Sequence, residues 1–217
     1  MASFEVLNVT DLARMGVERG ASDIHLTVMR PPTFRIDGKL VSLDEYPNLA
    51  PADTYKFGRE LMVDEKTFRQ IDEQGHADFS LSLSGVGRVR VNVYSQRGSY
   101  AIAIRLIPME VPDIETLGLP GVCKELPLKG SGLILVTGPT GSGKSTSLAA
   151  MINLINQTLR GNIITLEDPI EYLHRHGTCI INQREVGTDC PTFAQGLRAA
   201  LRQDPDVILV GEMRDLE

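Results

Sequence analysis

The chain has 217 residues, of which 42% are hydrophobic and 23% are charged, a balance that excludes a disordered or fibrous protein. This length suits two small domains better than one, so we expect a domain boundary inside it. The formal net charge of -6 argues against a surface devoted to nucleic acid, because such surfaces neutralise phosphates with cations. Apolar runs such as Leu133–Val136 and Val207–Val210 fall far short of the roughly 20 residues that span a membrane, so we expect no transmembrane segment.

The N-terminus and the cysteines indicate a cytoplasmic protein. The first residues mix acids, bases and apolar side chains and lack the continuous apolar core of a secretory signal. Cys123, Cys179 and Cys190 form no CxxC pair, and any disulfide scheme leaves one of them over, so we expect free thiols. Cys179 and Cys190 follow His174 and His176 at a spacing that matches no compact zinc module, and we predict no structural metal there.

Apolar spacing predicts mixed secondary structure in the first half of the chain. Asp37 and Gly38 stand between two β-prone arms, which is the pattern of a tight hairpin. The predicted elements, in chain order, are a helix at about Thr10–Arg19, a strand at Asp23–Met29, the hairpin Phe34–Val41, and helices at Ala52–Met62 and Glu65–Gln74.

Residues Ala77–Ile107 alternate between apolar and polar side chains, which predicts an antiparallel meander of three strands. On the middle strand the apolar positions are odd-numbered, so Arg88, Arg90 and Asn92 point to the opposite face, with Arg97 in the next turn. This cationic face has two interpretations, a solvated sheet surface or a binding surface. The spacing alone favours the solvated surface.

The chain changes character at Pro108–Asp113, which contains two prolines and two acids. Before this segment the pattern is that of an antiparallel sheet, and after it strands and helices alternate. We therefore predict an α+β domain at 1–107, a linker at 108–113 and an α/β domain at 114–217.

The segment Gly138–Ser145 fits the pattern G-x-x-x-x-G-K-[ST] of a phosphate-binding loop. Its context supports the match, because Leu133–Thr137 reads as a buried strand before it and a helix is predicted from Thr146 onward. The residues predicted to form the buried face of that helix are Leu148, Ile152, Ile155 and Leu159.

The residue types of this loop predict a site for the phosphates of ATP and for Mg²⁺. Glycines let the backbone curl so that N–H groups and the positive end of the helix face an anion. Lys144 supplies a full charge to the β- and γ-phosphates, and the Ser145 hydroxyl coordinates magnesium. The residues expected to bind the nucleotide are Gly138, Pro139, Thr140, Gly141, Ser142, Gly143, Lys144, Ser145 and Thr146.

Two later β-prone runs end in carboxylates. Glu167 and Asp168 end the first run, which stops at Pro169, and Glu212 follows the apolar run Val207–Val210. Phosphoryl transfer needs carboxylates to order the metal and to activate water. Because strand ends face the crevice of an open α/β sheet, we expect both glutamates in the site.

Four segments together resemble the type II/IV secretion ATPase superfamily, and within it the PilT-type pilus retraction ATPases. They are Gly20–Leu26, Gly138–Ser145, Thr165–Tyr172 and Leu197–Asp215. The resemblance implies a PAS-like N-terminal domain followed by a RecA-like P-loop ATPase domain. It also implies a homohexameric ring at an inner-membrane pilus platform protein, where ATP turnover powers pilus retraction and twitching motility.

The resemblance also assigns roles to single residues. It implies that Glu167 is the catalytic base for the attacking water and that Glu212 is the Walker B ligand of Mg²⁺. Lys144 is expected to be essential for hydrolysis. The meander arginines Arg90 and Arg97, together with Arg88, become expected phosphate sensors.

The chain departs from the family pattern at its C-terminus. It stops at Glu217, directly after the Walker B segment, without the family's histidine box, later strands and C-terminal helical region. We expect a fragment whose ATPase domain is incomplete and whose ATPase activity is weak or absent. The alternatives are an extension or secretion ATPase of the PilB or GspE kind, a RecA-like nucleic-acid translocase, or a nucleotide-binding regulatory module that does not hydrolyse ATP.

Overall fold

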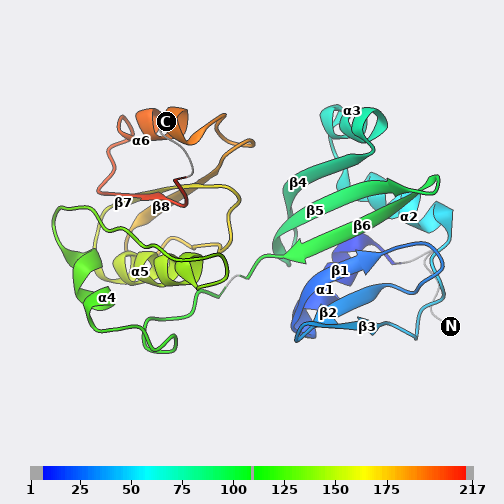
Figure 1. Cartoon of the computed structure of the whole chain (residues 1–217), viewed down its shortest axis with the longest axis horizontal. Coiled ribbons are helices and arrows are strands. Elements are labelled where there is room, and N and C mark those ends of the chain that lie inside the picture. Colours follow the sequence, from blue (N-terminus) through cyan, green and yellow to red (C-terminus); the bar gives the residue numbers. More distant parts are fainter. Residues whose placement is uncertain (1–6, 109, 214–217) are drawn as a thin grey trace. The chain divides into compact units, whose positions relative to one another are not determined.

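The computed structural model describes residues 7–108 and 110–213, and the chain divides into two compact units (Figure 1). The N-terminal unit is Met1–Ile107 and the C-terminal unit is Pro108–Glu217. The first contains an antiparallel sheet and the second a parallel one, so the chain is a mixed α/β protein. None of the helices in these described ranges has both the length and the apolar character that crossing a membrane requires.

The N-terminal unit is a six-stranded antiparallel sheet with strand order β3-β2-β1-β6-β5-β4, packed against three helices (Figure 1). The helices are α1 (Val9–Glu18), α2 (Pro51–Leu61) and α3 (Glu65–Gln74). The strands are β1 (Ala21–Leu26), β2 (Thr33–Ile36), β3 (Lys39–Ser42), β4 (His76–Leu83), β5 (Gly87–Gln96) and β6 (Ser99–Leu106).

Alternation along β5 decides which face of this sheet is buried. Val89, Val91 and Val93 are each 0% exposed, and they join one apolar cluster with residues of the three helices. Arg90 lies on the other face and is exposed. The predicted meander and its polar face are therefore confirmed. Helix α1 packs on β1, α2 on β6 and α3 on β4.

The hairpin between β2 and β3 is also confirmed. Asp37 has a φ of 48° and Gly38 a φ of 76°, and the flanking residues Ile36 and Lys39 pair directly. Two consecutive positive φ angles match the right-handed twist of the strands, and aspartate followed by glycine is a pair that tolerates them.

The C-terminal unit contains a three-stranded parallel sheet with strand order β8-β7-β9. Its strands are β7 (Asn162–Glu167), β8 (Ile180–Glu185) and β9 (Val207–Val210). Its helices are α4 (Val122–Glu125), the 3-10 turn η1 (Leu126–Leu128), α5 (Lys144–Thr158) and α6 (Phe193–Ala200). The three cysteines are free thiols.

Helix α5 covers one face of the parallel sheet. Ile152 and Ile155 of the helix form a buried cluster with Ile163 of β7 and Ile181 of β8. The odd-numbered residues of β7 therefore point toward α5. The predicted helix is confirmed, although Leu159 is not on its buried face: it is the C-cap residue and is 37% exposed.

The prediction of a buried strand at Leu133–Thr137 is wrong. These residues lie outside every strand, and the Leu133 and Leu135 side chains are 82% and 60% exposed. A strand needs a hydrogen-bonded partner, and β9 has β7 on one side and no further strand among the described residues on the other. A cavity of about 300 Å³, lined by Leu133 and by β9, lies between the two segments.

Candidate functional site

The glycine-rich loop leads directly into α5. Gly138, Gly141 and Gly143 have φ angles of 156°, 79° and 88°, which side chains with a Cβ adopt rarely. At Gly138 a Cβ atom would also lie 2.7 Å from Ser142 Oγ. Gly143 is the N-cap of α5 and supplies no side-chain cap, so the positive end of the helix stays open toward the loop.

Lys144 holds the loop in its curled form. Its Nζ donates to the carbonyl oxygens of Gly138 and Pro139, both at 2.9 Å. The ammonium charge is therefore kept at the loop, one residue before Ser145. The adjacent Thr146 Oγ1 shares a hydrogen bond of 3.2 Å with the Tyr172 hydroxyl.

A cavity of about 70 Å³ lies at the start of α5 and brings the predicted polar residues together. Ser145 comes from the helix, Glu167 from the end of β7 and Glu212 from the residues after β9. The complete lining is Ser145, Leu148, Ala149, Glu167, Asp168, Pro169, Glu171, Tyr172, His174, Leu209, Gly211 and Glu212. Glu212 reaches the cavity because Gly211 N–H donates to Leu166 O at 2.8 Å and so extends the pairing of β9 with β7.

The Glu167 carboxylate is half-buried and hydrogen-bonded. Burial raises the pKa of Glu167, while hydrogen bonds from the Thr165 hydroxyl, the Gln183 amide and the Glu171 backbone lower it. Thr165 Oγ1 donates to Glu167 Oε1 at 2.6 Å and Gln183 Nε2 donates to the same oxygen at 3.1 Å. A carboxylate whose pKa lies above its usual range is a stronger base than an exposed one, as water activation requires.

The donor set suits magnesium. Mg²⁺ prefers oxygen ligands and is usually held by one or two protein groups together with phosphate oxygens and water. Ser145 and Glu212 supply a hydroxyl and a carboxylate at one cavity. Within the described ranges no group of three or more His, Cys, Asp or Glu side chains forms a complete metal cage. The residues therefore fit a cation that arrives with a phosphate ligand rather than a resident ion.

His174 lies at the rim of this acidic cavity in neutral form. Burial lowers the pKa of His174 to about 4. Its Nδ1 is buried, and no hydrogen-bond partner for it occurs in the part of the chain that the structure describes. The ring is therefore uncharged at neutral pH and brings no positive charge to Glu167.

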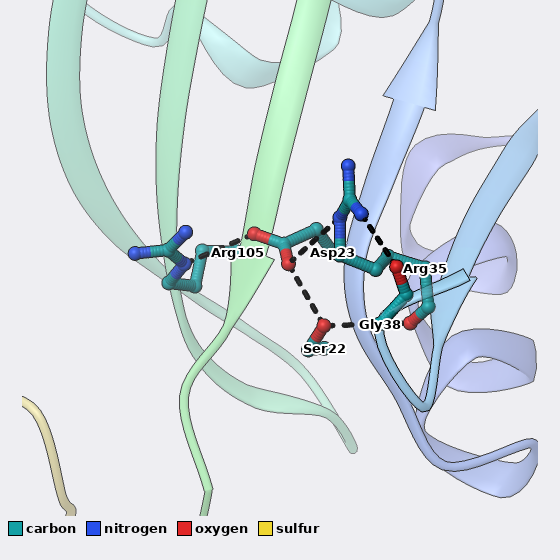
Figure 2. A network of polar contacts seen from close by, with 5 residues as sticks. All are labelled: Ser22, Asp23, Arg35, Gly38 and Arg105. Carbon is teal, nitrogen blue, oxygen red and sulfur yellow. Dashed lines mark hydrogen bonds and ion pairs between the residues drawn. The ribbon is translucent and has the colours of Figure 1, made fainter. Parts of the chain in front are cut away.

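The polar face of the N-terminal sheet carries a second group of charges (Figure 2). Arg105 Nε donates to Asp23 Oδ1 at 3.0 Å, and Arg35 Nε lies 4.0 Å from Asp23 Oδ2. Ser22 Oγ donates to the same Oδ2 at 2.8 Å. Arg90 stands directly opposite Arg105 on the neighbouring strand, and like charges directly opposite one another destabilise a sheet.

The arginines predicted as phosphate sensors do not lie together at one site. Arg88 and Arg90 lie on the polar face of β5, whereas Arg97 lies in the turn between β5 and β6 with a φ of 50°. At about 3.3 Å per residue, Arg97 lies roughly 20 Å along the strand from Arg90. Arg105 was missed by the sequence analysis, although the alternation of β6 already placed it on the face opposite Ile104.

Three residues that orient Glu167 or its loop were also missed. Thr165 had a signal in the sequence, because residues two apart on a strand share a face. Gln183 had none, because its position beside Thr165 depends on the parallel pairing of β7 with β8. The hydrogen bond of Tyr172 to Thr146 likewise joins segments that are 26 residues apart.

A curled glycine loop at the start of a helix, next to parallel strands that end in carboxylates, defines the class of protein. The family model for type II/IV secretion system proteins matches residues 6–217. The chain therefore belongs to the type II/IV secretion system protein family.

Within this family the chain is similar to pilus ATPases. It is 45% identical over 214 residues to the uncharacterised protein YggR of Escherichia coli K12, and this match covers 97% of this chain and 63% of YggR. It is 43% identical over 211 residues to the type IV pilus retraction ATPase PilT of Pseudomonas aeruginosa, covering 97% of this chain and 61% of PilT.

Among solved structures, the crystal structure of the pilus retraction motor PilT with bound ADP superposes with a TM-score of 0.88 at 54% identity. That match covers 97% of this chain and 61% of the PilT chain. The chain thus spans about three fifths of the length of the relatives named here. The recognition of a PilT-like ATPase homologue from sequence motifs is confirmed.

Proposed function

We propose that this chain binds ATP with Mg²⁺ at the loop Gly138–Ser145 and forms part of an ATP-hydrolysing motor that powers type IV pilus retraction. The observation that carries the proposal is the cavity at the start of α5, where Ser145, Glu167 and Glu212 meet. In this proposal the C-terminal unit is a RecA-like P-loop domain and the N-terminal unit is PAS-like. The similarity to PilT, whose crystal structure contains ADP, supports both the ligand and the process.

Each residue of the site has a physical role in this proposal. Lys144 and the backbone N–H groups of residues 138–146 hold the β- and γ-phosphates. Ser145 and Glu212 hold Mg²⁺, which neutralises charge that develops on the transferred phosphoryl group. Glu167 accepts the proton of the attacking water, because its burial makes the carboxylate more basic than usual.

The proposed assembly rests on membership of the family. We propose that the protein works as a homohexamer in the cytoplasm, at the inner-membrane face of a pilus platform protein. Arg90 and Arg97 are proposed phosphate contacts. The Arg90–Arg105 pair supports the proposal for Arg90 alone, because two arginines side by side attract an anion to that part of the sheet face. Replacing Arg90 by Ala should raise the KM for ATP without unfolding the sheet.

Nucleotide binding can be tested on this chain. Lys144→Ala should weaken the binding of a fluorescent ADP analogue with Mg²⁺ about 10- to 100-fold, because charge-assisted hydrogen bonds to phosphate are lost. Lys129→Ala makes the same change of charge outside the phosphate loop and should bind normally. Equal affinity for Lys144→Ala and the unmodified chain would refute the proposed site.

Hydrolysis can be tested in the full-length natural protein that contains this chain. Glu167→Gln keeps the size of the side chain and one oxygen that can accept from Thr165 and Gln183, but it removes the base, so hydrolysis should fall by about 10²- to 10⁴-fold. ATP binding should remain, because the neutral amide carries no charge that repels phosphate. Undiminished hydrolysis by Glu167→Gln would exclude Glu167 as the base, and tight ATP retention without any hydrolysis by the unmodified protein would indicate a regulatory module instead.

A further inference from the structure

Gln183 is the residue that connects Glu167 to the loop between β7 and β8. Its Nε2 donates to Glu167 Oε1 at 3.1 Å and to Tyr172 O at 2.8 Å, and its Oε1 accepts from His174 N–H at 2.8 Å. The two hydrogens of an amide nitrogen are thus both used. The opposite amide orientation would place Oε1 against a carboxylate and a carbonyl oxygen, so one orientation is fixed.

The position of Gln183 follows from the sheet. It lies on β8 directly beside Thr165 of β7, on the face that α5 covers. Thr165 and Gln183 therefore approach Glu167 Oε1 from its own strand and from the neighbouring one. Both groups donate, and a carboxylate only accepts, so the pair stabilises the ionised form of Glu167 against the cost of its burial.

The same amide also fixes the loop that closes the cavity. Tyr172 and His174 line the cavity, and Gln183 bonds to the backbone of both. The Tyr172 hydroxyl in turn shares a hydrogen bond with Thr146 in the first turn of α5. A continuous set of contacts therefore runs from the helix that follows the phosphate loop, through Tyr172 and Gln183, to Glu167.

We propose that Gln183 is a positioning residue: its amide orients the Glu167 carboxylate and joins it to the backbone of the 168–174 loop. One electrostatic consequence is that the donated hydrogen bond favours the ionised carboxylate. The catalytic meaning of this inference rests on the proposed function. The effect of Gln183 on the ionisation of Glu167 does not rest on that function, because it concerns the titration of one carboxyl group in this chain. A side chain with a purely structural role would affect folding stability but not that titration.

The test is a direct titration of Glu167 by NMR. The chain is labelled with ¹³C at the side-chain carboxyl of glutamate, and Glu167 is assigned with the Glu167→Gln variant. Gln183→Met preserves the length of the side chain and removes the amide, so the pKa of Glu167 should rise by about one unit. Gln183→Glu should raise it further, because it adds a like charge beside Glu167.

A matched control is available on the same strand. Asn182 is the neighbouring residue, and its Nδ2 donates to Asn162 Oδ1 rather than to the cavity. Asn182→Ala should leave the pKa of Glu167 unchanged. An unshifted Glu167 titration in folded Gln183→Met, or an equal shift in Asn182→Ala, would overturn the inference.

A second measurement needs no substitution at Gln183. In the unmodified chain, the ¹H and ¹⁵N shifts of the Gln183 side-chain amide should follow the ionisation of Glu167 at the same midpoint. Amide shifts that stay constant through that transition would overturn the inference. Failure of the proposed function is distinguishable, because undiminished hydrolysis by Glu167→Gln would remove the catalytic role and leave these titrations as they are.

Discussion

The two units of this protein differ in how their apolar residues are gathered into a core. In the N-terminal unit, Ile24, Phe34 and Ile104 are each 0% exposed and belong to one continuous cluster. In the C-terminal unit, the described core is split into two smaller clusters, and Leu133 and Leu135 remain 82% and 60% exposed. In the first sheet, neighbouring strands are consecutive in the chain except where β1 pairs with β6, whereas in the second sheet every pairing is parallel and needs a crossover connection.

The difference separates the core of the protein from its candidate site. The antiparallel sheet has a core that its own strands and helices complete, and its polar face is left for charged side chains. The parallel sheet places the residues of the candidate site at strand ends, where the loops after β7 and β9 meet α5. A change in the core of the first unit should therefore affect stability, and a change near the exposed apolar segment of the second should affect it little.

The largest effect is expected from the core of the N-terminal unit. Phe34→Ala should lower the free energy of unfolding by about 3–5 kcal/mol, because a fully buried ring is replaced by a cavity. Urea denaturation followed by tyrosine fluorescence measures this, since the chain has no tryptophan and Tyr172 alone of its tyrosines lies outside this unit. Leu40→Ala, at a side chain that is 59% exposed, is the control and should change the free energy by less than about 0.5 kcal/mol.

An intermediate effect is expected from the half-buried His174 of the C-terminal unit. The pKa of this ring is about 4 in the folded state and lies near 6.5 in the unfolded chain, so the unfolded state binds more protons between these values. The stabilising contribution is complete above about pH 6.5 and decreases as the pH falls toward 4, by at most about 1.4 kcal/mol per pH unit. The free energy of unfolding, measured by chemical denaturation at several pH values, should decrease less between pH 6.5 and pH 4 in His174→Gln than in the unmodified chain.

A comparison with the N-terminal unit sharpens this prediction. Burial also lowers the pKa of His25, but the nearby Asp23 carboxylate raises it and so opposes the effect. The exposed His76 provides the control, and His76→Gln should leave the change of the unfolding free energy with pH as it is in the unmodified chain. The same change with pH in His174→Gln and His76→Gln would contradict a neutral ring at position 174.

The smallest effect on stability is expected at the exposed apolar segment. Leu133→Ser should change the free energy of unfolding by less than about 0.5 kcal/mol, because the side chain is already in contact with water. The same change should reduce self-association at high concentration, measured by sedimentation velocity, because it removes part of an exposed apolar patch. A loss above about 2 kcal/mol would mean that Leu133 is buried and that the contrast between the two units is wrong.

The sequence predicted the parts of the fold that depend on local information. The hairpin at Asp37–Gly38 and the meander were correct, because turn residues and alternation act over a few positions. The strand at Leu133–Thr137 was predicted from its apolar, β-prone residues alone. Whether such a run becomes a strand depends on an available edge, and the edge of β9 lies across a cavity from it.

The residues of the candidate site also differ in whether the sequence could identify them. The loop, Glu167 and Glu212 stand out in the sequence because a motif or a strand end marks them. Gln183 carries no such mark, because an amide within a polar strand is common and its role depends on the register of β8 against β7. Sequence patterns identified groups that carry charge, and only the register identified the group that orients one of them.

The two hydrogen bonds from Lys144 to Gly138 and Pro139 would make the proposed binding of phosphate an exchange reaction. An anion that reaches the lysine competes with two carbonyl oxygens that already hold it at 2.9 Å. The measured affinity is then the difference between two sets of contacts, which is smaller than the attraction between an ammonium and a phosphate alone. Without a phosphate the loop keeps its curled form, because the ammonium then donates to its own backbone.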